Sequence, residues 1–368
     1  MPQPVEPPDT SAPRAAQPGP TGPGPRRLFV IAVLAAVLGL GITLSFGYAD
    51  HAPEPHDIKV AVAALAAVSA KLAAGLQRAE PGGFRLIEVG SAAAAVHSVR
   101  SQQAAGALIV AASGANTLVT AGADGTLQQQ VLTSALGAAS KAMGRPVKAV
   151  DVAPLSAGDR SGLSSFVFGL GLLIPSVLGT LLLFLFGMRW RLWWRVAAAT
   201  VFALLAAAGG VLALDTILGA FTTGSTAELI GIGFLGALSY VLFVTALQAV
   251  VGLPGTGLAA IAFIFVGNAV SGGSVPIAFL PNVFRQVAPW LPNSAIVSGA
   301  RDVVYFNGHN LGHALLVLGL WPAAALAVLG LVDLLHIAEQ RRLAHPAHEI
   351  YRTPAVVHLA RRLRARSA

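Results

Sequence analysis

Long apolar runs are the feature of this sequence that most limits what it can fold into. The first, LFVIAVLAAVLGLGITLSFGY at Leu28–Tyr48, contains no charged residue. At about 1.5 Å per residue, a helix of this length crosses a hydrocarbon core of about 30 Å. Only 11% of the 368 residues are charged, against about 25% in soluble domains. Much of the chain is therefore expected to lie in a bilayer.

Five further apolar segments follow in the second half of the chain, and one of them, Pro254–Val270, is shorter than the rest. The sequence predicts an α-helical polytopic membrane protein with six transmembrane helices, one followed by five. An extracytoplasmic α/β domain is inserted after the first helix. The predicted spans are Leu28–Tyr48, Ser164–Gly187, Val196–Phe221, Glu228–Val250, Pro254–Val270 and His313–His336.

The predicted domains follow from this pattern. Residues 1–27 are rich in Pro and Gly, which predicts a disordered cytoplasmic N-terminus because such a segment has little to bury. A signal peptide is the alternative to a first span at 28–48, but its apolar core would be about 7–15 residues long. Residues 49–163 form the α/β domain. Residues 164–336 form a five-helix membrane domain, and residues 337–368 form a basic cytoplasmic tail.

Within residues 49–163, alternating and helical patterns succeed one another. Strands are expected at Asp57–Ala63, Phe84–Val89 and Pro146–Val152 and a hairpin at Ala107–Ala121, while helices are expected at Ala64–Ala79, from Ser91 to about Gln103 and at Thr126–Met143. Glu80, Glu88, His97, Arg100 and Asp124 form no recognisable catalytic set and are expected on the surface.

Basic residues set the predicted orientation, because cytoplasmic loops carry an excess of Lys and Arg. Arg26 and Arg27 precede the first span, three arginines occupy 189–195, and seven lie in the tail. Counting alternate crossings places all of these in the cytoplasm, so both termini are expected on the cytoplasmic side of the plasma membrane. Since the positive charge flanks spans instead of covering a soluble face, nucleic-acid binding is not expected.

No nucleotide-binding loop, zinc-protease motif or nucleophile elbow is present, and there is no cysteine. The sequence therefore predicts no catalytic residue, no metal site and no cofactor in this chain, which is not expected to be an enzyme. Asp215 is a candidate intramembrane acid, because such residues often line substrate or ion paths. The alternative is a near-interface residue that is paired or wetted.

Between the last two spans lies a segment broken by Pro and Gly, yet poor in charge. Non-helical backbone is tolerated at membrane depth only where protein buries it or it lines a wet cavity. We therefore expect residues 271–311 to form a re-entrant helix pair at the outer surface. Arg301 and Asp302 are either a local ion pair on its wet face or a gate or head-group contact.

The run RWRLWWR at 189–195 also has two interpretations. It is either an interfacial belt that binds anionic lipid or a docking element for a cytoplasmic partner. The residues concerned are Arg189, Trp190, Arg191, Trp193, Trp194 and Arg195.

With this topology, several motifs resemble the membrane subunits of ABC-2-type exporters, in the YhgE/Pip-like or DUF3533-like branch. They are Val152-Ala153-Pro154-Leu155 with Gly158-Asp159, Gly267-Asn268, Ser271-Gly272-Gly273, Pro276, Leu280-Pro281, Pro289-Trp290-Leu291-Pro292 and Ala300–Phe306.

The resemblance implies a homodimer and a separate ATPase, which holds the ATP and docks at Met188–Arg195. It makes Ser271–Phe306 an outer gate, whose candidate residues are Asn268, Ser271, Gly272, Gly273, Pro276, Pro289, Pro292, Arg301, Asp302 and Tyr305. The implied function is export of a hydrophobic or lipid-like substrate. The alternative is a non-transporting envelope protein whose external domain binds a cell-wall, secretion or phage partner.

Overall fold

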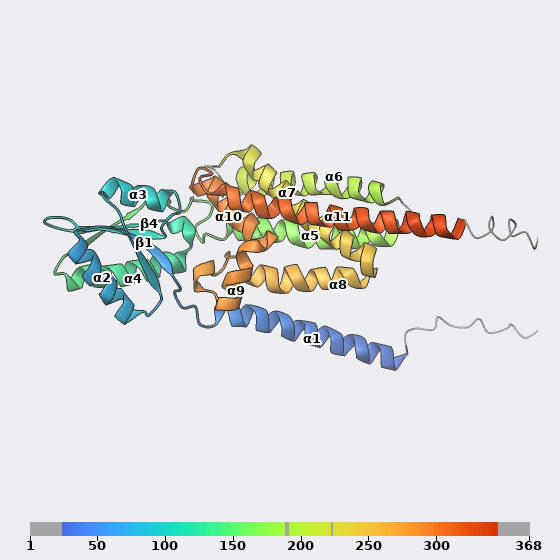
Figure 1. The fold of residues 1–368 in the computed structure, drawn as a ribbon, viewed down its shortest axis with the longest axis horizontal. Coiled ribbons are helices and arrows are strands. Elements are labelled where there is room, and N and C mark those ends of the chain that lie inside the picture. Colours follow the sequence, from blue (N-terminus) through green and yellow to red (C-terminus); the bar gives the residue numbers. More distant parts are fainter. Residues whose placement is uncertain (1–23, 188–190, 222–223, 345–368) are drawn as a thin grey trace, which may run out of the picture. The chain divides into compact units, whose positions relative to one another are not determined.

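The computed structural model describes residues 24–187, 191–221 and 224–344 (Figure 1). Among these residues, five helices are long and apolar enough to cross a membrane. They are α1 Pro25–Asp50, α5 Ser164–Gly187, α6 Leu192–Val211 with a π-helical continuation Leu212–Ile217, α7 Thr226–Val251 and α11 Leu311–Ala344. The protein is therefore membrane-embedded, as its low charge predicts.

As far as Leu44, α1 belongs to a unit of its own. It begins at Pro25, three residues before the predicted start, so the disorder predicted for residues 1–27 is wrong at 25–27, and residues 1–23 lie outside the described residues. The end of α1 belongs to the second unit. There the Ser45 hydroxyl donates a 2.9 Å hydrogen bond to the carbonyl of Phe265, and Ala49 is buried.

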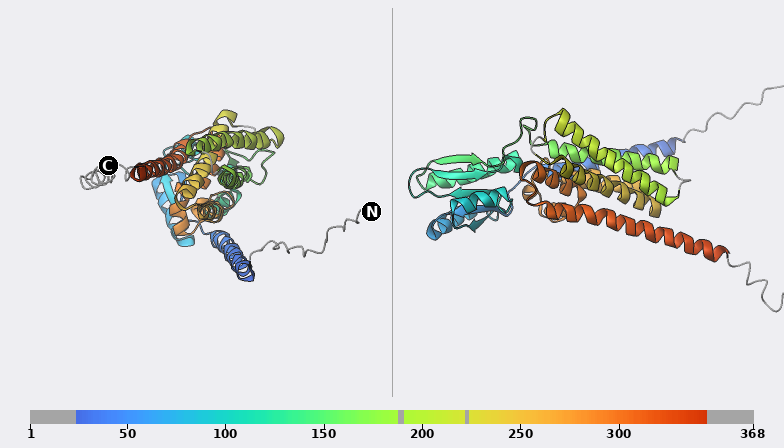
Figure 2. Two further views of the ribbon diagram at one scale, coloured as in Figure 1. Left: turned by 90° about the vertical axis from the view of Figure 1, so that its right-hand side faces the viewer. Right: turned by 90° about the horizontal axis from the view of Figure 1, so that it is seen from above.

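Helix α7 is the central helix of the second unit, and α5, α6, α10 and α11 all pack against it (Figure 2). Two of its glycines allow this close approach. A side chain at Gly233 would meet Phe168 at 2.7 Å, and one at Gly236 would meet Ile296 at 2.6 Å. Small residues let helices approach closely where lipid offers no hydrophobic driving force between them.

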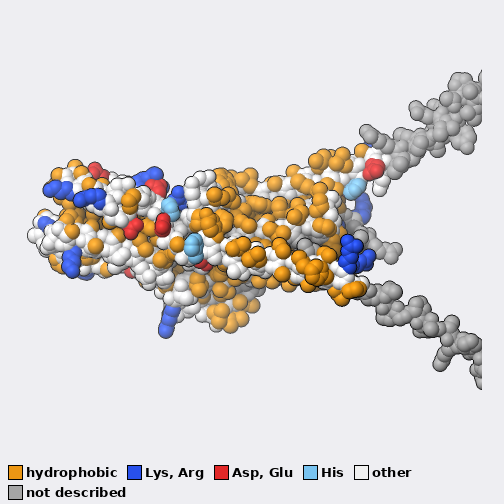
Figure 3. All heavy atoms as spheres, turned by 90° about the horizontal axis from the view of Figure 1, so that it is seen from below, with side chains coloured by type: hydrophobic (Ala, Val, Ile, Leu, Met, Phe, Trp, Pro, Cys, Tyr) orange, Lys and Arg blue, Asp and Glu red, His pale blue; other side chains and the backbone are white. Residues whose placement is uncertain are grey.

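The outer faces of these helices are apolar. Exposed side chains include Leu178, Leu182, Leu204, Leu205, Leu316 and Leu320. Figure 3 shows hydrophobic side chains covering most of the visible helical surface, while charged side chains gather beyond its ends. This is the surface expected of helices solvated by lipid tails.

The predicted span at Pro254–Val270 is shorter than the others in the structure as well. It consists of α8 Pro254–Ala260 and a π-helix Ile261–Gly267, with seven residues each. After it come the short helices Ile277–Phe279, α9 Asn282–Val287 and Ala288–Trp290, and then α10 Pro292–Tyr305. We call residues 268–310 the broken segment.

The α/β domain holds a five-stranded sheet in the order β2-β1-β3-β4-β5. Only β3 and β4 pair antiparallel, as the hairpin pattern predicts. The strands are β1 Ile58–Ala63, β2 Phe84–Glu88, β3 Gly106–Ile109, β4 Asn116–Thr120 and β5 Val147–Asp151, and the helices are α2 Ala66–Ala79, α3 Ala92–Arg100 and α4 Thr126–Ala142.

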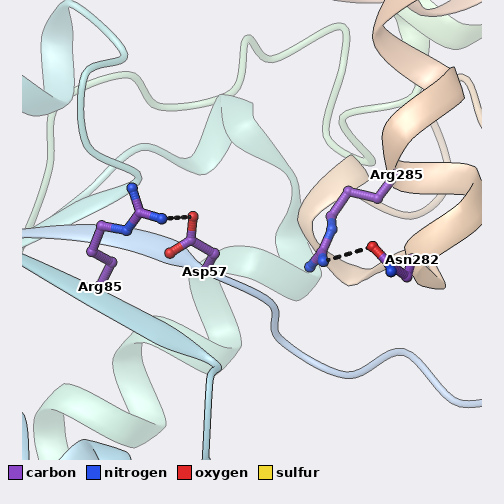
Figure 4. A network of polar contacts seen from close by, with 4 residues as sticks. All are labelled: Asp57, Arg85, Asn282 and Arg285. Carbon is purple, nitrogen blue, oxygen red and sulfur yellow. Dashed lines mark hydrogen bonds and ion pairs between the residues drawn. The ribbon is translucent and has the colours of Figure 1, made fainter.

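Each predicted element of this domain is present within a few residues of its expected ends. Ser91 caps α3 as expected, because its hydroxyl accepts a hydrogen bond from the amide of Ala94. Asp57, before β1, forms a 2.6 Å ion pair with Arg85 on β2 (Figure 4). The same figure shows a contact within the broken segment, where Arg285 donates a hydrogen bond to Asn282.

The two faces of the sheet have separate cores. Helices α2 and α4 cover one face, where Leu72 and Leu136 are buried, and α3 covers the other with Val99 (Figure 1). The broken segment adds one phenylalanine to each core. Phe279 is buried with α2 and α4, and Phe306 is buried on the α3 face.

Other contacts tie the same end of the domain to the helical part. The Ser156 hydroxyl donates to the carbonyl of Ala220 at 2.8 Å, and the amide of His56 donates to the carbonyl of Ala278 at 2.9 Å. The backbone at Gly158 lies directly against Gly219, where a side chain would be only 2.2 Å from the carbonyl oxygen. The domain is therefore held at several points and is not suspended from a linker.

Three predicted span boundaries are wrong by four residues or more, and one of them is the end of the π-helical continuation of α6, at Ile217 instead of Phe221. Helix α6 begins at Leu192 instead of Val196, so that Trp193, Trp194 and Arg195 form its first turn and not a loop. Helix α11 continues from Leu311 through Ala344, past the predicted end at His336. Both helices extend beyond their apolar stretches because Trp, Arg, Glu and Gln are acceptable helix residues, and apolarity alone does not mark a helix end.

Phe279→Ala is expected to lower the free energy of unfolding by about 3–5 kcal/mol, the usual loss for truncating a buried phenylalanine. Thermal unfolding and limited proteolysis of the purified protein measure the effect. The control is Val283→Ala, four residues on, at a side chain that is 66% exposed. Equal melting of the two variants would show that Phe279 does not stabilise the domain.

Candidate functional site

A polar cavity of about 330 Å³ lies where the α/β domain meets the broken segment. We call it the junction cavity. The domain contributes Asp57–Lys59, Gln102–Ala105, Asp124 and Gln128, and the broken segment contributes Ser271, Gly272, Pro276–Ala278, Val297, Ser298, Arg301 and Asn310.

Arg301 is the cation that the broken segment contributes to this cavity, and Lys59 of β1 is the other. It lies on α10, a helix most of whose residues are buried. Its two terminal nitrogens each lie 3.4 Å from the carbonyl oxygen of Gly272, which makes two long hydrogen bonds. Burial lowers the pKa of Arg301, and the nearby Asp124 and Asp159 act in the opposite direction. The guanidinium is thus partly desolvated and only weakly bonded.

Gly272 is required at this position for a conformational reason. Its φ of 76° is one that residues with side chains rarely adopt. A side chain there would also meet Ile277 at 3.0 Å. The turn at Ser271–Gly273 therefore aims a backbone carbonyl at Arg301 in a way that few other residues would allow.

Asp124 is the carboxyl group of the cavity that has no ion pair within 4.0 Å among the residues the structure describes, whereas Asp57 pairs with Arg85. It ends the short helix Gly122–Asp124 that follows β4, and Gly125, at a φ of 117°, then turns the chain against Pro276. Burial raises the pKa of Asp124 to about 6, opposed first by Arg301 and then by a hydrogen bond from Gln102. Asp124 therefore titrates near neutral pH.

Asp302 and Arg301 do not pair with one another, and the local ion pair considered from the sequence is wrong. Asp302 is buried and accepts a 2.8 Å hydrogen bond from the amide of Asn310. The ion pair between Arg85 and Asp57 is the only one within 4.0 Å among the residues the structure describes. Adjacent helical residues point in different directions, about 100° apart, so that Arg301 and Asp302 meet different partners.

Tyr305 and Asp159 form a second link at the junction. The Tyr305 hydroxyl donates a 3.0 Å hydrogen bond to Asp159, and the same carboxylate accepts one from the amide of Ser164 at the start of α5. Asp159 is thus a cap for α5 as well as a partner of α10.

The structure divides the predicted gate residues into three groups. Ser271, Gly272, Pro276 and Arg301 line the junction cavity. Pro289 and Asp302 line a neighbouring hollow of about 160 Å³ with His313. Asn268, Gly273, Pro292 and Tyr305 line neither; Gly273 lies against Phe166, and Pro292 begins α10.

Asp215 does not line the junction cavity either. It lies in the π-helical turn Leu212–Ile217 and accepts a 3.3 Å hydrogen bond from the Thr226 hydroxyl. This partner fits the alternative of a paired residue near the interface.

The predicted coupling residues lie around the start of α6. Arg189 and Trp190 lie outside the described residues. Arg191 is the exposed residue before α6, and Trp193 and Trp194 expose 54% and 68% of their surface. Arg195 lies over the ring of Phe184 at 5.6 Å. Arg191, Trp193 and Trp194 are thus available to a lipid surface or a partner protein.

Asp124 and Gln102 are the residues that sequence reasoning missed, since Asp124 was expected on the surface. The sequence signal for Asp124 was the Gly122–Gly125 turn directly after a buried strand, because loops that follow strands often carry functional side chains. Asn293 was also missed. Its amide donates a 3.1 Å hydrogen bond to the carbonyl of Phe263 in the π-helix.

Comparison of the chain with protein-family models and with curated proteins finds no match. Among the described residues, no group of three or more His, Cys, Asp or Glu side chains is placed to hold a metal ion. The site therefore has to be interpreted from its own groups. These are two cations, Arg301 and Lys59, and two carboxyl groups, Asp124 with a pKa of about 6 and Asp57, which pairs with Arg85, together with amide and hydroxyl neighbours.

Asp124 makes the stability of the folded protein depend on pH, and its raised pKa determines the direction of the change. Because its pKa of about 6 lies above the ordinary value of 3.8, the folded state holds the proton more tightly than the unfolded chain. The stability from this proton is fully present below about pH 3.8 and is lost progressively as the pH rises to about 6. Asp124→Asn keeps the group neutral throughout and is expected to remove this loss.

Thermal unfolding at pH 5 and pH 7.5 measures the effect, which we expect to be a difference of a few degrees between the two proteins. Glu88→Gln, which neutralises an exposed carboxylate on β2, is the control. An unchanged pH dependence in Asp124→Asn would mean that Asp124 is charged in the folded protein over this range.

Proposed function

We propose that this chain is the membrane subunit of an ATP-driven exporter of the ABC-2 type, which moves a hydrophobic or lipid-like substrate outward. The observation that carries the proposal is the placement of the broken segment. Through Ile296 it packs against α5 and α7, and through Phe279 and Phe306 it packs into both cores of the α/β domain. A displacement of α10 would therefore move both parts together.

The proposed coupling begins at Arg191–Arg195. These residues lie at the start of α6, next to the end of α5, and Arg195 contacts Phe184 of α5. At its other end, α5 contacts α10, where Gly169 lies close to Val297 and Ile296. An ATPase that pushed on Arg191 and its neighbours would thus act on a helix that touches the broken segment.

The junction cavity supplies what a gate needs, a polar hollow between apolar layers. Arg301 is held by long hydrogen bonds that can be exchanged at low cost, and Asp124 can change charge near neutral pH. We propose that opening separates Arg301 from Gly272, while Tyr305, one turn further along α10, keeps its hydrogen bond to Asp159 before the start of α5. The chain itself carries no ATP site in this proposal.

We propose six crossings, with Pro254–Gly267 as the short fifth, both termini in the cytoplasm, and a homodimer in the plasma membrane. The support is that α7 and α8 are joined by a tight turn at Gly252 and Leu253, beside which Gln248, Gly255 and Thr256 are buried. There Gln248 donates to Thr180 and Thr256, and Gly255 lies against Leu247. The chain thus reverses direction after α7, as two successive crossings require.

The ATPase partner is tested by purifying the full-length protein from native membranes in mild detergent. Mass spectrometry of the bound proteins is expected to find a stoichiometric P-loop ATPase, and Arg191→Glu is expected to reduce its recovery by about tenfold or more, because a basic docking contact becomes acidic. Arg341→Glu, at an exposed arginine on α11, is the matched control and should retain the partner.

Recovery of a clean protein with no ATPase, or with cell-wall proteins alone, would refute the exporter function. It would favour the alternative of a non-transporting envelope protein whose external domain binds its partner. Equal ATPase recovery in Arg191→Glu and wild type would refute only the docking site.

The topology is tested with single cysteines, which is straightforward because the chain has none of its own. Ser113→Cys, in the exposed turn between β3 and β4, is expected to react with a membrane-impermeant maleimide in intact cells. Gln340→Cys, near the end of α11, should react only after the cells are opened. Labelling of both in intact cells would overturn the proposed orientation.

A further inference from the structure

The α/β domain carries a second hollow, larger than the junction cavity and separate from it. It is a groove of about 1070 Å³ lined by residues of α2 and α4. These two helices lie on the same face of the sheet (Figure 1). Its floor is apolar, with Leu72, Leu76, Val110, Val131 and Met143 among the lining residues. We call it the helix groove. Its volume is slightly above the usual range for ligand sites, about 300–1,000 Å³.

The groove is open because the facing sides of the two helices carry small residues. Helix α4 contributes Ala135, Ala138, Ala139 and Ala142, and α2 contributes Gly75. A side chain at Gly75 would meet no atom within 4 Å. Larger residues here would close the groove and bury more apolar surface, at about 25 cal/mol per Å². The sequence thus leaves apolar area uncovered on a domain outside the membrane part.

The groove runs along the domain from one end to the other. One end is formed by Pro53 and Pro55, a few residues after α1 ends at Asp50, where Pro55 touches the turn at Gly83. The neighbouring His56 is bonded to the broken segment. The opposite end is formed by Val110 and Arg145. A long thin ligand could therefore pass from the helical part toward the far end of the domain.

Charge on the rim is unbalanced. Lys71, Arg78 and Arg145 line the groove, and Glu80 is the one acidic residue among them, which leaves a net charge of +2. The guanidinium of Arg145 is fixed by hydrogen bonds to the carbonyls of Ala111 and Ala112. Lys71 lies on an exposed position of α2 beside the floor residue Leu72. An apolar floor with a basic rim is complementary to an alkyl chain that ends in an anion.

We propose that the helix groove binds one alkyl chain of an anionic amphiphile, such as a fatty acid, with the chain on the apolar floor and the anion at Lys71 and Arg78. The inference rests on the proposed export function for its biological meaning, since it names the class of substrate that would leave the membrane. Binding itself requires no transport, so that it can be tested without an ATPase.

The experiment uses the full-length protein in nanodiscs of phosphatidylcholine and a palmitic acid that carries a photoactivatable diazirine. After irradiation, mass spectrometry maps the labelled peptides. We expect label on α2 and α4 at groove-lining residues. Gly75→Phe puts a bulky side chain in the groove, and its Cβ would meet no atom within 4 Å. It should reduce that label by about tenfold or more, the weakening that loss of two buried methylene contacts causes.

Gly137→Phe is the matched control. Gly137 is also a helical glycine with no atom near its added side chain, but it lies on α4 outside the helix groove. Its label should equal that of the wild type. Label confined to the membrane-spanning helices, or equal label in Gly75→Phe and wild type, would overturn the proposal.

The anionic head group is tested separately with the matching diazirine alcohol, which has the same chain and no charge. Lys71→Glu is expected to reduce labelling by the acid several-fold and to leave labelling by the alcohol unchanged. Lys148→Glu makes the same charge change on β5, away from the groove, and should alter neither. Loss of both labels in Lys71→Glu, or of neither, would refute the role of charge.

These outcomes are independent of the ATPase experiment. Groove labelling in a protein that recovers no ATPase would leave amphiphile binding standing and remove export. Recovery of an ATPase partner without groove labelling would support export and refute amphiphile binding in the helix groove.

Discussion

The burial of Phe279 and Phe306 in the two cores of one sheet is the constraint on which the rest of this structure depends. A small α/β domain normally closes its own cores, with a helix layer on each face. Here one residue of each core comes from a segment that lies between the last helices of the bundle. The domain, the broken segment and the bundle are therefore not independent, and a displacement of one is transmitted to the others.

In the helical part, the broken segment brings backbone without regular hydrogen bonds against apolar helices. Polar side chains provide the missing hydrogen-bond partners. Ser294 donates to the carbonyl of Val270, Asn293 to Phe263, and Ser45 to Phe265. The last two carbonyls lie in the π-helix Ile261–Gly267, where wider turns leave carbonyl groups to be satisfied from outside. This also explains why α10 is buried while carrying Asn, Ser, Arg and Asp.

Much of this architecture was predictable from local pattern. The α/β elements followed from strand alternation and from caps such as Ser91, and the long spans followed from apolar length. The sheet order did not, since nothing local shows that β3 lies beside β1. The junction cavity was only half predictable: Pro and Gly mark the turns that carry Ser271 and Gly272, but Asp124 reaches Arg301 from more than 170 positions earlier in the chain. Pairings over such separations depend on packing, which short-range periodicity does not encode.

The shortness of Pro254–Gly267 has a consequence for the lipid around it. Fourteen helical residues extend about 21 Å, against a hydrocarbon layer of about 30 Å. If this segment crosses, the bilayer beside it must thin, and head groups are drawn toward the middle of the membrane at that side of the bundle. A thinned patch shortens the distance that a polar head group travels through hydrocarbon, so the protein would lower the barrier to lipid displacement by its length alone, before any side chain acts on a substrate.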